Sequence, residues 1–308
     1  MQNNTEENKK TYCGHIAIIG RPNVGKSTLL NAILGKKISI TSRKPQTTRQ
    51  QILGIKTVAN SQLIFTDTPG LFCTKTGSEK KALNRRMLKN ALNAIHDVDL
   101  IIFVCDGLNW NDDDEWILDK VKKETCPVIL VVNKVDQIKN KGEILPHLEK
   151  LKEKANFSNL VPISAKNSTN VLELEKIISR LLPENPFLFA KDQITDRGDK
   201  FLASEIIREK LMRFLGEELP YAVLVHLEKF EQTPKLVTIH ALILVEKDSQ
   251  KAIVIGKNGL KLKEIGTNAR LDMEKLFDNK VFLKLWVKVK NNWRNNEKLL
   301  EELEHETY

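Results

Sequence analysis

Close to its N-terminus the chain reads Gly20-Arg21-Pro22-Asn23-Val24-Gly25-Lys26-Ser27, which matches the pattern G-x-x-x-x-G-K-[ST]. An apolar run at residues 15–19 precedes it and predicts a strand, and a helical pattern over residues 26–34 follows it. In this context a glycine loop binds phosphate, because its backbone N–H groups point inward and the helix N-terminus adds partial positive charge. We expect Lys26 to reach the β- and γ-phosphates and Ser27 to ligate Mg²⁺. The other nucleotide-binding residues expected in and after this loop are Asn23, Val24, Gly25 and Thr28.

Around this loop, short β-rich apolar runs alternate with helical patterns from residue 12 to residue 182. The expected strands are residues 15–19, 51–58, 62–66, 100–105, 128–132 and 160–163. The expected helices are residues 26–34, 83–95, 113–123, 142–152 and 171–182. Such alternation predicts an α/β domain, with a mostly parallel sheet covered by helices on both faces.

A second polar motif, Asp67-Thr68-Pro69-Gly70, follows the expected strand 62–66. A carboxylate at a strand end can hold Mg²⁺ directly or through water, so Asp67 is an expected metal ligand beside Ser27. Gly70 lets its backbone N–H approach the γ-phosphate. Alone the motif is a common turn, but its position downstream of the glycine loop favours a role in nucleotide binding.

Two further motifs end the next strands and predict which base is bound. Asn133-Lys134-Val135-Asp136 follows the apolar run 128–132, and Ser164-Ala165-Lys166 follows the run 160–163. Guanine presents an N1–H and an N2 amine, and one carboxylate, here that of Asp136, can accept from both. We expect Asn133 to tie the loops together and to contact the base, and Lys134 to lay its methylenes on the ring. The Ser164-Ala165-Lys166 backbone is expected to donate to the guanine O6.

Together these motifs resemble the translation-factor-related GTPases of the Ras-like superfamily. In such proteins a loop corresponding to residues 42–50 forms the first switch, and one threonine in it adds a Mg²⁺ ligand when the γ-phosphate is present. We expect Thr48 to be that ligand, and Thr47 is an alternative that spacing does not exclude. The resemblance implies a Ras-like domain that hydrolyses GTP, with Lys26, Asn23, Thr48 and Gly70 at the chemistry.

One position departs from the Ras-like pattern. Where some members have a glutamine that orients the attacking water, this chain has Leu71, which can neither donate nor accept a hydrogen bond. Resemblance to GTPases with an asparagine in the glycine loop implies that K⁺, held by Asn23, supplies the missing charge. That Asn23 only stabilises the loop is equally compatible with the sequence.

A different pattern follows residue 182. Pro183-Glu184-Asn185-Pro186 breaks the last helix, and residues 183–199 read as a linker. Beyond it the expected order is helix, strand, strand, helix, helix, strand, which predicts a small α+β domain over residues 200–293. A charged C-terminal helix or tail follows at 294–308.

The two later helices of this domain are joined by Gly256-Lys257-Asn258-Gly259. A G-x-x-G turn between helices lets a nucleic-acid backbone pass close, because neither glycine has a side chain. Together with the element order, the turn resembles a type II KH domain, which implies binding of single-stranded nucleic acid. The expected RNA-binding residues are Gly256, Lys257, Asn258, Gly259, Lys261, Lys263 and Arg270.

Two tryptophans in or after the last strand are candidates for base stacking. For Trp286 a core or docking position is the favoured interpretation, because it lies in an alternating strand over residues 281–289. Trp293 follows that strand. Lys284, Lys288 and Lys290 either extend a positive surface or form a solvated strand face.

With both domains in view, the chain resembles the Era family over about residues 12–293. The local strings that carry the resemblance are residues 36–44, 194–197, 203–211, 218–221 and 285–290. The resemblance implies an assembly GTPase that binds the 3′ region of small-subunit 16S rRNA and assists assembly of the 30S subunit. It also implies peripheral association with the inner membrane. We expect RNA rather than DNA as the partner, and a monomer, since nothing in the sequence demands a dimer.

Composition fits these expectations without proving them. The formal net charge of +9 favours an anionic partner, although solubility alone would also explain it. The four cysteines are Cys13, Cys73, Cys105 and Cys126; none has metal spacing, and the last two are predicted core thiols. The polar N-terminus and the lack of a long apolar run predict a cytoplasmic protein.

Two other classes of function compete with this interpretation. One is a GTP-dependent switch for a protein or membrane partner, in which the G-x-x-G turn is purely structural. The other is an RNA-binding module whose nucleotide site is only structural, against which the intact Lys26, Ser27 and Asp67 argue.

Overall fold

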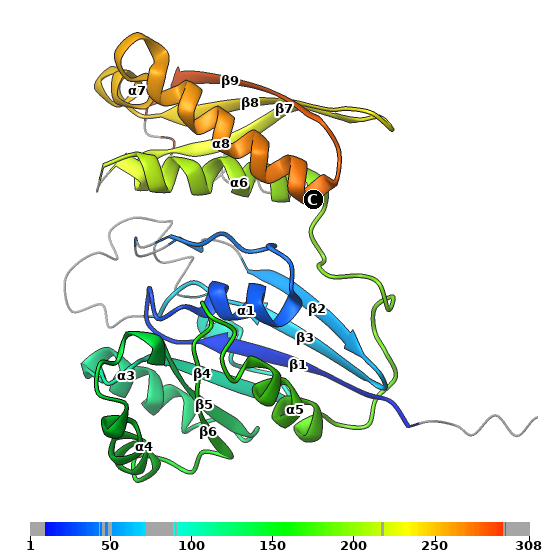
Figure 1. Cartoon of the computed structure of the whole chain (residues 1–308), viewed down its shortest axis with the longest axis vertical. Helices are drawn as coiled ribbons and strands as arrows, with labels where there is room; N and C mark the ends of the chain where they lie inside the picture. The colour runs from blue at the N-terminus through cyan, green and yellow to red at the C-terminus, as the bar shows by residue number, and fades with distance from the viewer. Residues whose placement is uncertain are drawn as a thin grey trace, which may run out of the picture. The chain divides into compact units, whose positions relative to one another are not determined.

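The computed structural model of the chain describes residues 10–42, 44, 47–48, 51–71, 89, 91–216, 219–291 and 293. These residues fall into two compact units, labelled by element in Figure 1. The chain leaves the first unit after Lys36, and the segment up to residue 48 groups with the second. The first unit also includes residues 183–196, so this division differs from the boundaries predicted at residues 182 and 200.

The first unit is built on one six-stranded sheet. Its strands are β1 (Tyr12–Ile19), β2 (Ile52–Val58), β3 (Ser61–Asp67), β4 (Leu100–Asp106), β5 (Val128–Asn133) and β6 (Asn159–Pro162). Their order is β2-β3-β1-β4-β5-β6. Only β2 runs antiparallel to its neighbour, β3. The mostly parallel α/β sheet predicted from the alternating pattern is confirmed.

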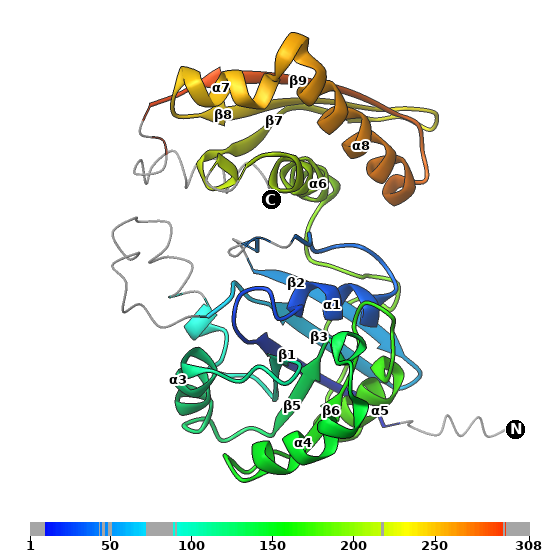
Figure 2. The same cartoon turned by 60° about the vertical axis from the view of Figure 1, so that its left-hand side comes forward.

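Helices lie on both faces of this sheet. The labelled α-helices in the described residues of this unit are α1 (Lys26–Leu34), α3 (Asp112–Val121), α4 (Ile144–Lys152) and α5 (Val171–Leu181). In Figure 2 the strands lie between α3 on one side and the pair α1 and α5 on the other. Every residue of β5 is buried, as two-sided coverage requires. Most of the helix predicted over residues 83–95 lies outside the described residues.

Residues 183–196 are tied to the first unit by hydrogen bonds. Cys13 N donates to Pro183 O, and Ile55 N donates to Ile194 O over 2.8 Å. The buried carboxamide oxygen of Gln62 accepts from Leu188 N at 2.8 Å, and its nitrogen donates to Phe189 O at 2.9 Å. The segment predicted as a linker is therefore anchored along much of its length.

The second unit has the predicted order of helix, two strands, two helices and a strand. Its elements are α6 (Asp199–Phe214), β7 (Leu224–Gln232), β8 (Val237–Val245), α7 (Asp248–Ile255), α8 (Leu260–Phe277) and β9 (Val281–Val289). In the sheet β7-β8-β9, the first pair is antiparallel and the second parallel. The sequence predicts the first strand of this unit over residues 221–230, but the strand begins three residues later. The cause is the proline-containing stretch Leu219–Ala222, which forms a 3₁₀ turn.

One apolar core holds this unit together. The inward residues of β8, Val237, Ile239, Ala241 and Ile243, pack with buried side chains of all three helices. Alternation along a strand sends the residues between them to the other face of the sheet. The helices therefore cover one face only.

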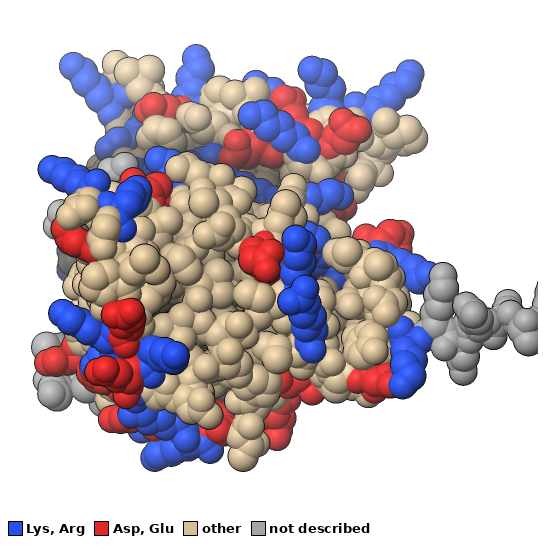
Figure 3. Space-filling view, turned by 60° about the horizontal axis from the view of Figure 1, so that its bottom comes forward, with Lys and Arg blue, Asp and Glu red and all other residues tan. Residues whose placement is uncertain are grey.

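Three further predictions from the sequence concern the cysteines, membrane-spanning helices and the distribution of charge. Cys105 is buried as predicted, but Cys126 is only half-buried, because it lies in the loop before β5 rather than in the strand; Cys73 is outside the described residues. In the described part of the chain no helix is long and apolar enough to cross a membrane. On the face shown in Figure 3, basic and acidic side chains are mixed, so the net positive charge does not gather there.

Candidate functional site

The glycine loop runs from the end of β1 to the start of α1. Two of its glycines have a positive φ, 145° at Gly20 and 101° at Gly25. A Cβ on Gly25 would lie 2.2 Å from the side chain of Asn133, so the close approach of these two segments requires glycine. The α1 N-terminus then opens at Lys26, as the sequence predicts.

Lys26 is enclosed by the loop that it follows. Its Nζ donates to the carbonyl oxygens of Gly20 at 2.9 Å and Arg21 at 2.8 Å. Burial lowers the pKa of Lys26 to about 8, and the charge of Asp67 opposes that shift. A bound phosphate would also favour the ammonium form, so this enclosed lysine suits an anionic ligand.

The two oxygen groups predicted to hold Mg²⁺ lie together. Ser27 Oγ donates to Asp67 Oδ2 over 2.7 Å, and the side chain of Asp67 is fully buried. A hydroxyl and a carboxylate are the hard oxygen donors that Mg²⁺ takes from proteins, so these residues fit the ion. The parallel register that pairs Ile18 with Asp67 brings the two strand ends side by side.

The Asp67-Thr68-Pro69-Gly70 turn packs on the glycine loop. A Cβ on Gly70 would lie 2.6 Å from Pro22 N, and Thr68 Oγ1 donates to Ile18 O over 2.8 Å. Leu71 N donates to Gly20 O, and the Leu71 side chain is fully buried. The structure thus gives Leu71 a packing role and leaves no polar group at this position.

Asn133 joins the strand ends that were predicted to bind guanine. Its Nδ2 donates to Val24 O over 2.8 Å, and its Oδ1 accepts from Ala165 N over 3.0 Å. The residue is buried, so both partners would be left without their hydrogen bond if it were truncated. This side chain physically connects the glycine loop to both base-reading motifs.

The remaining base-site residues are held by side-chain contacts. Asp136 Oδ1 accepts from Ser164 Oγ over 2.6 Å, which orients the carboxylate predicted to read guanine. Lys134 pairs with Asp106 over 2.8 Å and has a left-handed backbone, with φ 63°. Lys166 is exposed. The structure therefore brings the predicted residues of the β5 and β6 ends into one cluster.

Asn23 is exposed in the glycine loop and has φ 65°. Asparagine adopts the left-handed region more readily than most residues, which is sufficient reason for its presence in the loop. A role in binding K⁺ is neither required nor opposed by this geometry.

A buried ion pair that sequence reasoning missed anchors the glycine loop to α3. Arg21 Nε lies 2.7 Å from Asp114 Oδ2, and Arg21 Nη2 donates to Asn109 O over 2.7 Å. Asp114 is fully buried, and burial raises its pKa although Arg21 opposes the shift. No local signal in the sequence links these residues, which are far apart along the chain.

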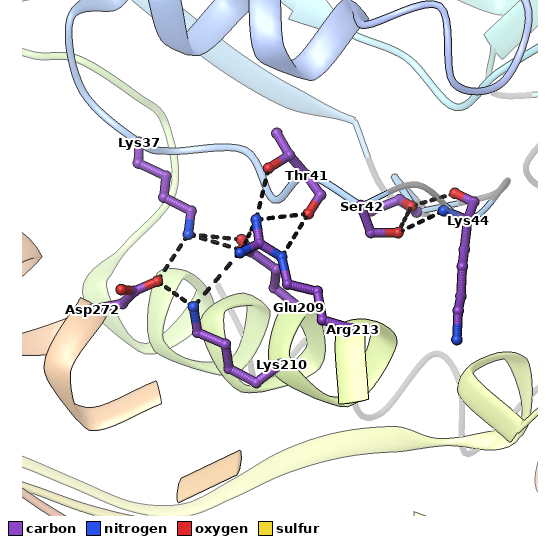
Figure 4. Close-up of polar contacts among 9 residues, drawn as sticks. Lys37, Thr41, Ser42, Lys44, Glu209, Lys210, Arg213 and Asp272 are labelled. Atoms are coloured by element: carbon purple, nitrogen blue, oxygen red, sulfur yellow. Dashed lines mark hydrogen bonds and ion pairs between the residues drawn. The ribbon is translucent and has the colours of Figure 1, made fainter. Parts of the chain in front are cut away.

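The segment after α1 lies within the second unit and is held by charged groups of α6 and α8 (Figure 4). Lys37 Nζ lies 2.9 Å from Glu209 Oε2 and 3.0 Å from Asp272 Oδ2. Arg213 Nη2 lies 2.6 Å from Glu209 Oε1 and donates to Thr41 O over 3.2 Å. Glu209 is fully buried, so loss of these cations would leave a buried carboxylate without an ion-pair partner.

Further along the same segment, Lys44 and Thr47 are also engaged. Lys44 Nζ donates to Gly216 O over 2.9 Å, and Thr47 Oγ1 donates to Lys44 O over 2.7 Å. Thr48 is buried within the second unit. Residues 43, 45, 46, 49 and 50 of the predicted first switch lie outside the described residues. A second switch was expected from Asp67 through residues 72–81, and residues 72–81 also lie outside them.

The predicted RNA-binding turn has the backbone expected of it. Gly256 and Gly259 have φ 71° and 74°, and a Cβ on Gly256 would lie 2.6 Å from Lys261 Cβ. Lys257, Asn258 and Lys263 are exposed, whereas Lys261 is half-buried. The turn therefore offers an open backbone and cations to a ligand.

Other residues near the turn alter the prediction in detail. Arg270 is half-buried and paired with Glu274 over 2.7 Å, so its charge is partly neutralised. Exposed Ile253 and Leu260 flank the turn, so the surface around it is partly apolar. Sequence reasoning passed over both because they fit the apolar spacing of their helices.

For Trp286 the core interpretation was wrong, whereas a docking position stays a prediction. Trp286 is not a core residue: it is 36% exposed on the outward face of β9. Trp293 is the buried one, at 1% exposed. The inward positions of β9 are the odd-numbered ones, so the alternation that suggested a core position places Trp286 outside.

Together the two folds and their sites define a class of protein: a Ras-like P-loop nucleotide-binding domain followed by a KH domain. Comparison with known families agrees, since residues 15–134 match the family described as "50S ribosome-binding GTPase" and residues 218–294 match the KH domain.

Curated relatives identify the family. The chain is 57% identical to GTPase Era of Coxiella burnetii (strain Dugway 5J108-111) over 295 residues, covering 96% of this chain and 98% of the relative. It is also 57% identical to GTPase Era of Haemophilus influenzae (strain PittGG), covering 97% of this chain and 98% of the relative. The chain belongs to the Era family of GTPases.

Solved structures support the same assignment. A structure of Era in complex with MgGDPNP and nucleotides 1506–1542 of 16S ribosomal RNA matches with a TM-score of 0.89 at 39% identity, covering 95% of this chain and 98% of that one. An Aquifex aeolicus Era variant bound to GDP·AlF₄⁻ matches with the same TM-score and identity, covering 95% of this chain and 99% of that one.

Proposed function

We propose that this GTPase is a molecular switch that binds the 3′ region of 16S rRNA through its KH domain and assists assembly of the 30S subunit. The observation that carries the proposal is the pairing, in one chain, of a guanine-type site joined by Asn133 with an open G-x-x-G turn at Gly256–Gly259. The Era relative solved with nucleotides 1506–1542 of 16S rRNA supports the choice of RNA.

In the nucleotide site, the glycine-loop residues 23–28 surround the phosphates, with Lys26 as the principal cation. Asp136 reads the guanine edge, Lys134 covers the ring, and the backbone of residues 164–166 donates to the O6. Gly70 donates its N–H to the γ-phosphate. The contacts of Asn133 and Ser164 support these roles because they hold the base-reading loops in one arrangement.

The Mg²⁺ ion binds Ser27 and Asp67, and Thr48 joins when the γ-phosphate is present. When bound, Mg²⁺ stabilises the charge that develops on the phosphates. Thr47 stays the alternative ligand; its Oγ1 donates to Lys44 O over 2.7 Å and lies 2.8 Å from Ser42 Oγ.

Hydrolysis needs a charge or a water-orienting group that Leu71 does not provide. K⁺ held by Asn23 is one source of that charge, and a partner that binds the GTP state is the other. The experiment that separates them is GTP hydrolysis in Na⁺ or K⁺ buffer, with and without an oligonucleotide of the 16S rRNA 3′ end. A K⁺ requirement places Asn23 at the chemistry, and stimulation by the RNA supports the coupled switch. Guanine-nucleotide binding with no hydrolysis under any of the four conditions, nor with whole 30S subunits added, would contradict a GTPase switch.

Nucleotide state reaches the KH domain through the segment 37–48. This segment carries Thr48 at one end, and at the other Lys37 and Thr41 contact the α6 side chains Glu209 and Arg213. Ordering of Thr48 by the γ-phosphate would therefore act on the part of the chain that is already bound to KH helices. Residues 183–199, which are anchored along much of their length, offer a second covalent route by which nucleotide state acts on the KH domain.

The protein works in the cytoplasm as a monomer and associates peripherally with the inner membrane. Resemblance to the Era family is the support for this part of the proposal. Fractionation of cells into soluble and membrane material, with and without ribosomes bound, tests it; a protein absent from the membrane fraction in both would oppose the membrane association.

A further inference from the structure

The outward face of the KH sheet is the face that no helix of the described chain covers. The inward residues of β8 and the helices α6, α7 and α8 form the core on the opposite side. The G-x-x-G turn joins two of those helices, so it belongs to the helical side of the domain. The outward face is therefore a separate surface of the same domain.

On β9 this face alternates between aromatic rings and lysines. Its outward residues are, in order, Phe282, Lys284, Trp286 and Lys288, all of them exposed, and exposed Lys290 follows the strand. No acidic side chain interrupts the series. On β7, Glu231 is paired with Lys229 over 3.0 Å.

The rings form one continuous cluster across two strands. His240 on β8 lies beside Lys284 in the strand register, between the two aromatic residues of β9. Its ring centroid is 6.3 Å from that of Phe282 and 5.4 Å from that of Trp286, both edge-on. Lys284 Nζ lies 4.8 Å from the Trp286 ring centroid. Phe282 and Trp286 are four residues apart, which is about 13 Å along a strand.

The exposure of these aromatic rings to solvent requires an explanation. Phe282 is 52% exposed. Among the described residues, Phe282 and Trp286 are the aromatic side chains in the set of exposed large apolar residues. Aromatic platforms interleaved with cations bind single-stranded nucleic acid, because bases stack on the rings and phosphates meet the cations. A protein partner fits less well, since lysine is depleted in protein–protein interfaces.

We propose that the face formed by Phe282, His240, Trp286, Lys284 and Lys288 is a second RNA-binding surface, which holds unpaired bases independently of the G-x-x-G turn. It extends the RNA contact beyond the roughly four nucleotides that a KH turn clamps. This inference rests on the proposed function only for the choice of RNA as the ligand.

The test uses the full chain and two single-stranded RNA probes, a twenty-nucleotide and a six-nucleotide oligonucleotide containing 4-thiouridine. The double variant Phe282→Leu/Trp286→Leu keeps apolar surface but removes both rings. We expect its affinity for the long probe to fall about tenfold or more. The short probe, which the turn alone can hold, should bind as in the wild type. Phe282→Tyr/Trp286→Phe keeps both rings and should restore long-probe binding, and Leu172→Ala, an exposed apolar change in the first unit, should have no effect.

A second pair of measurements does not depend on the aromatic variants. Lys284→Ala/Lys288→Ala should reduce the slope of log affinity against log salt for the long probe by about 1.4, as loss of two phosphate contacts to a single strand requires. Photocrosslinking should place the long probe on residues 281–289. Unchanged long-probe affinity and salt slope, with crosslinks only at the helical side, would overturn the proposal. The variant Lys257→Ala/Lys263→Ala tests the G-x-x-G contact separately. We expect it to lose binding of the short probe.

Discussion

The side-chain nitrogen of Asn133 donates a hydrogen bond to the carbonyl oxygen of Val24 over 2.8 Å. This bond connects the end of β5 to the glycine loop, while Asn133 Oδ1 holds Ala165 N of the next strand end. The phosphate-binding and base-reading segments are therefore one hydrogen-bonded structure rather than three independent loops. Nucleotide affinity should depend on this buried side chain even if it never touches the ligand.

Replacing Asn133 tests that dependence. We expect Asn133→Ala to weaken GDP binding about tenfold to a hundredfold, because two buried polar groups lose their partner at a cost of about 1–3 kcal/mol. Isothermal titration calorimetry of the full chain measures the affinity. Asn167→Ala, on the exposed loop nearby, is the control. An Asn133→Ala protein that binds GDP normally would show that the bond is incidental.

Asp136 should determine which base is bound. In Asp136→Asn an amide N–H replaces one carboxylate oxygen, so the residue can donate to the oxygen that xanthine carries where guanine has its amine. We predict GDP affinity reduced by about 1–3 kcal/mol and a preference for xanthosine diphosphate. Competition between the two nucleotides measures this. Retained preference for GDP would place base recognition elsewhere.

The Arg21–Asp114 pair should support the glycine loop. Asp114→Ala leaves the Arg21 guanidinium, which is mostly buried, without its carboxylate, and breaking such a pair costs about 3 kcal/mol or more. We expect a lower thermal unfolding temperature for the first unit, and a loss of GDP affinity, measured by differential scanning calorimetry with and without GDP. Exposed Asp112→Ala on the same helix is a control for changes in helix charge. Equal stability of the two variants would contradict a supporting role.

Asp272 gives a prediction that depends on pH. Burial would raise its pKa, but hydrogen bonds from Lys210 and then Lys37 outweigh burial and hold the pKa below its ordinary 3.8. Because the folded-state pKa is depressed, the carboxylate stabilises the fold fully above pH 3.8, and this contribution is lost as the pH falls through the lower folded value.

Asp272→Asn should therefore destabilise the KH domain by about 1–3 kcal/mol at pH 6, and the difference from wild type should shrink below pH 3.8. Urea unfolding of the full chain at several pH values, following the KH transition, measures it. Glu228→Gln, an exposed change on β7, is the matched control. A difference that stays constant from pH 6 to pH 3 would show that the charge of Asp272 is not the cause.

Much of this architecture could be predicted because it is encoded locally. The glycine loop, the apolar strands and the helical spacing before the G-x-x-G turn each lie within a few consecutive residues. The bounds of α1 and β9 agree with the predicted ranges 26–34 and 281–289. The element order of the second unit followed from the same local periodicity.

Other features depend on contacts between residues far apart in sequence. Nothing near Arg21 indicates its pairing with Asp114, and nothing near Lys37 indicates Glu209 or Asp272. Trp286 was misplaced for a related reason: alternation shows that a strand has two faces but not which face is covered. Only the positions of α6, α7 and α8 decide that.

The central claim is that the bound nucleotide controls RNA binding by the KH domain. Its most direct test is the equilibrium affinity of the full chain for an oligonucleotide of the 16S rRNA 3′ end, measured with GDP and with the non-hydrolysable analogue GDPNP at one salt concentration. The account predicts tighter binding with GDPNP, because the γ-phosphate orders Thr48 and the segment 37–48 that contacts α6. Equal affinities in the two nucleotide states would contradict it.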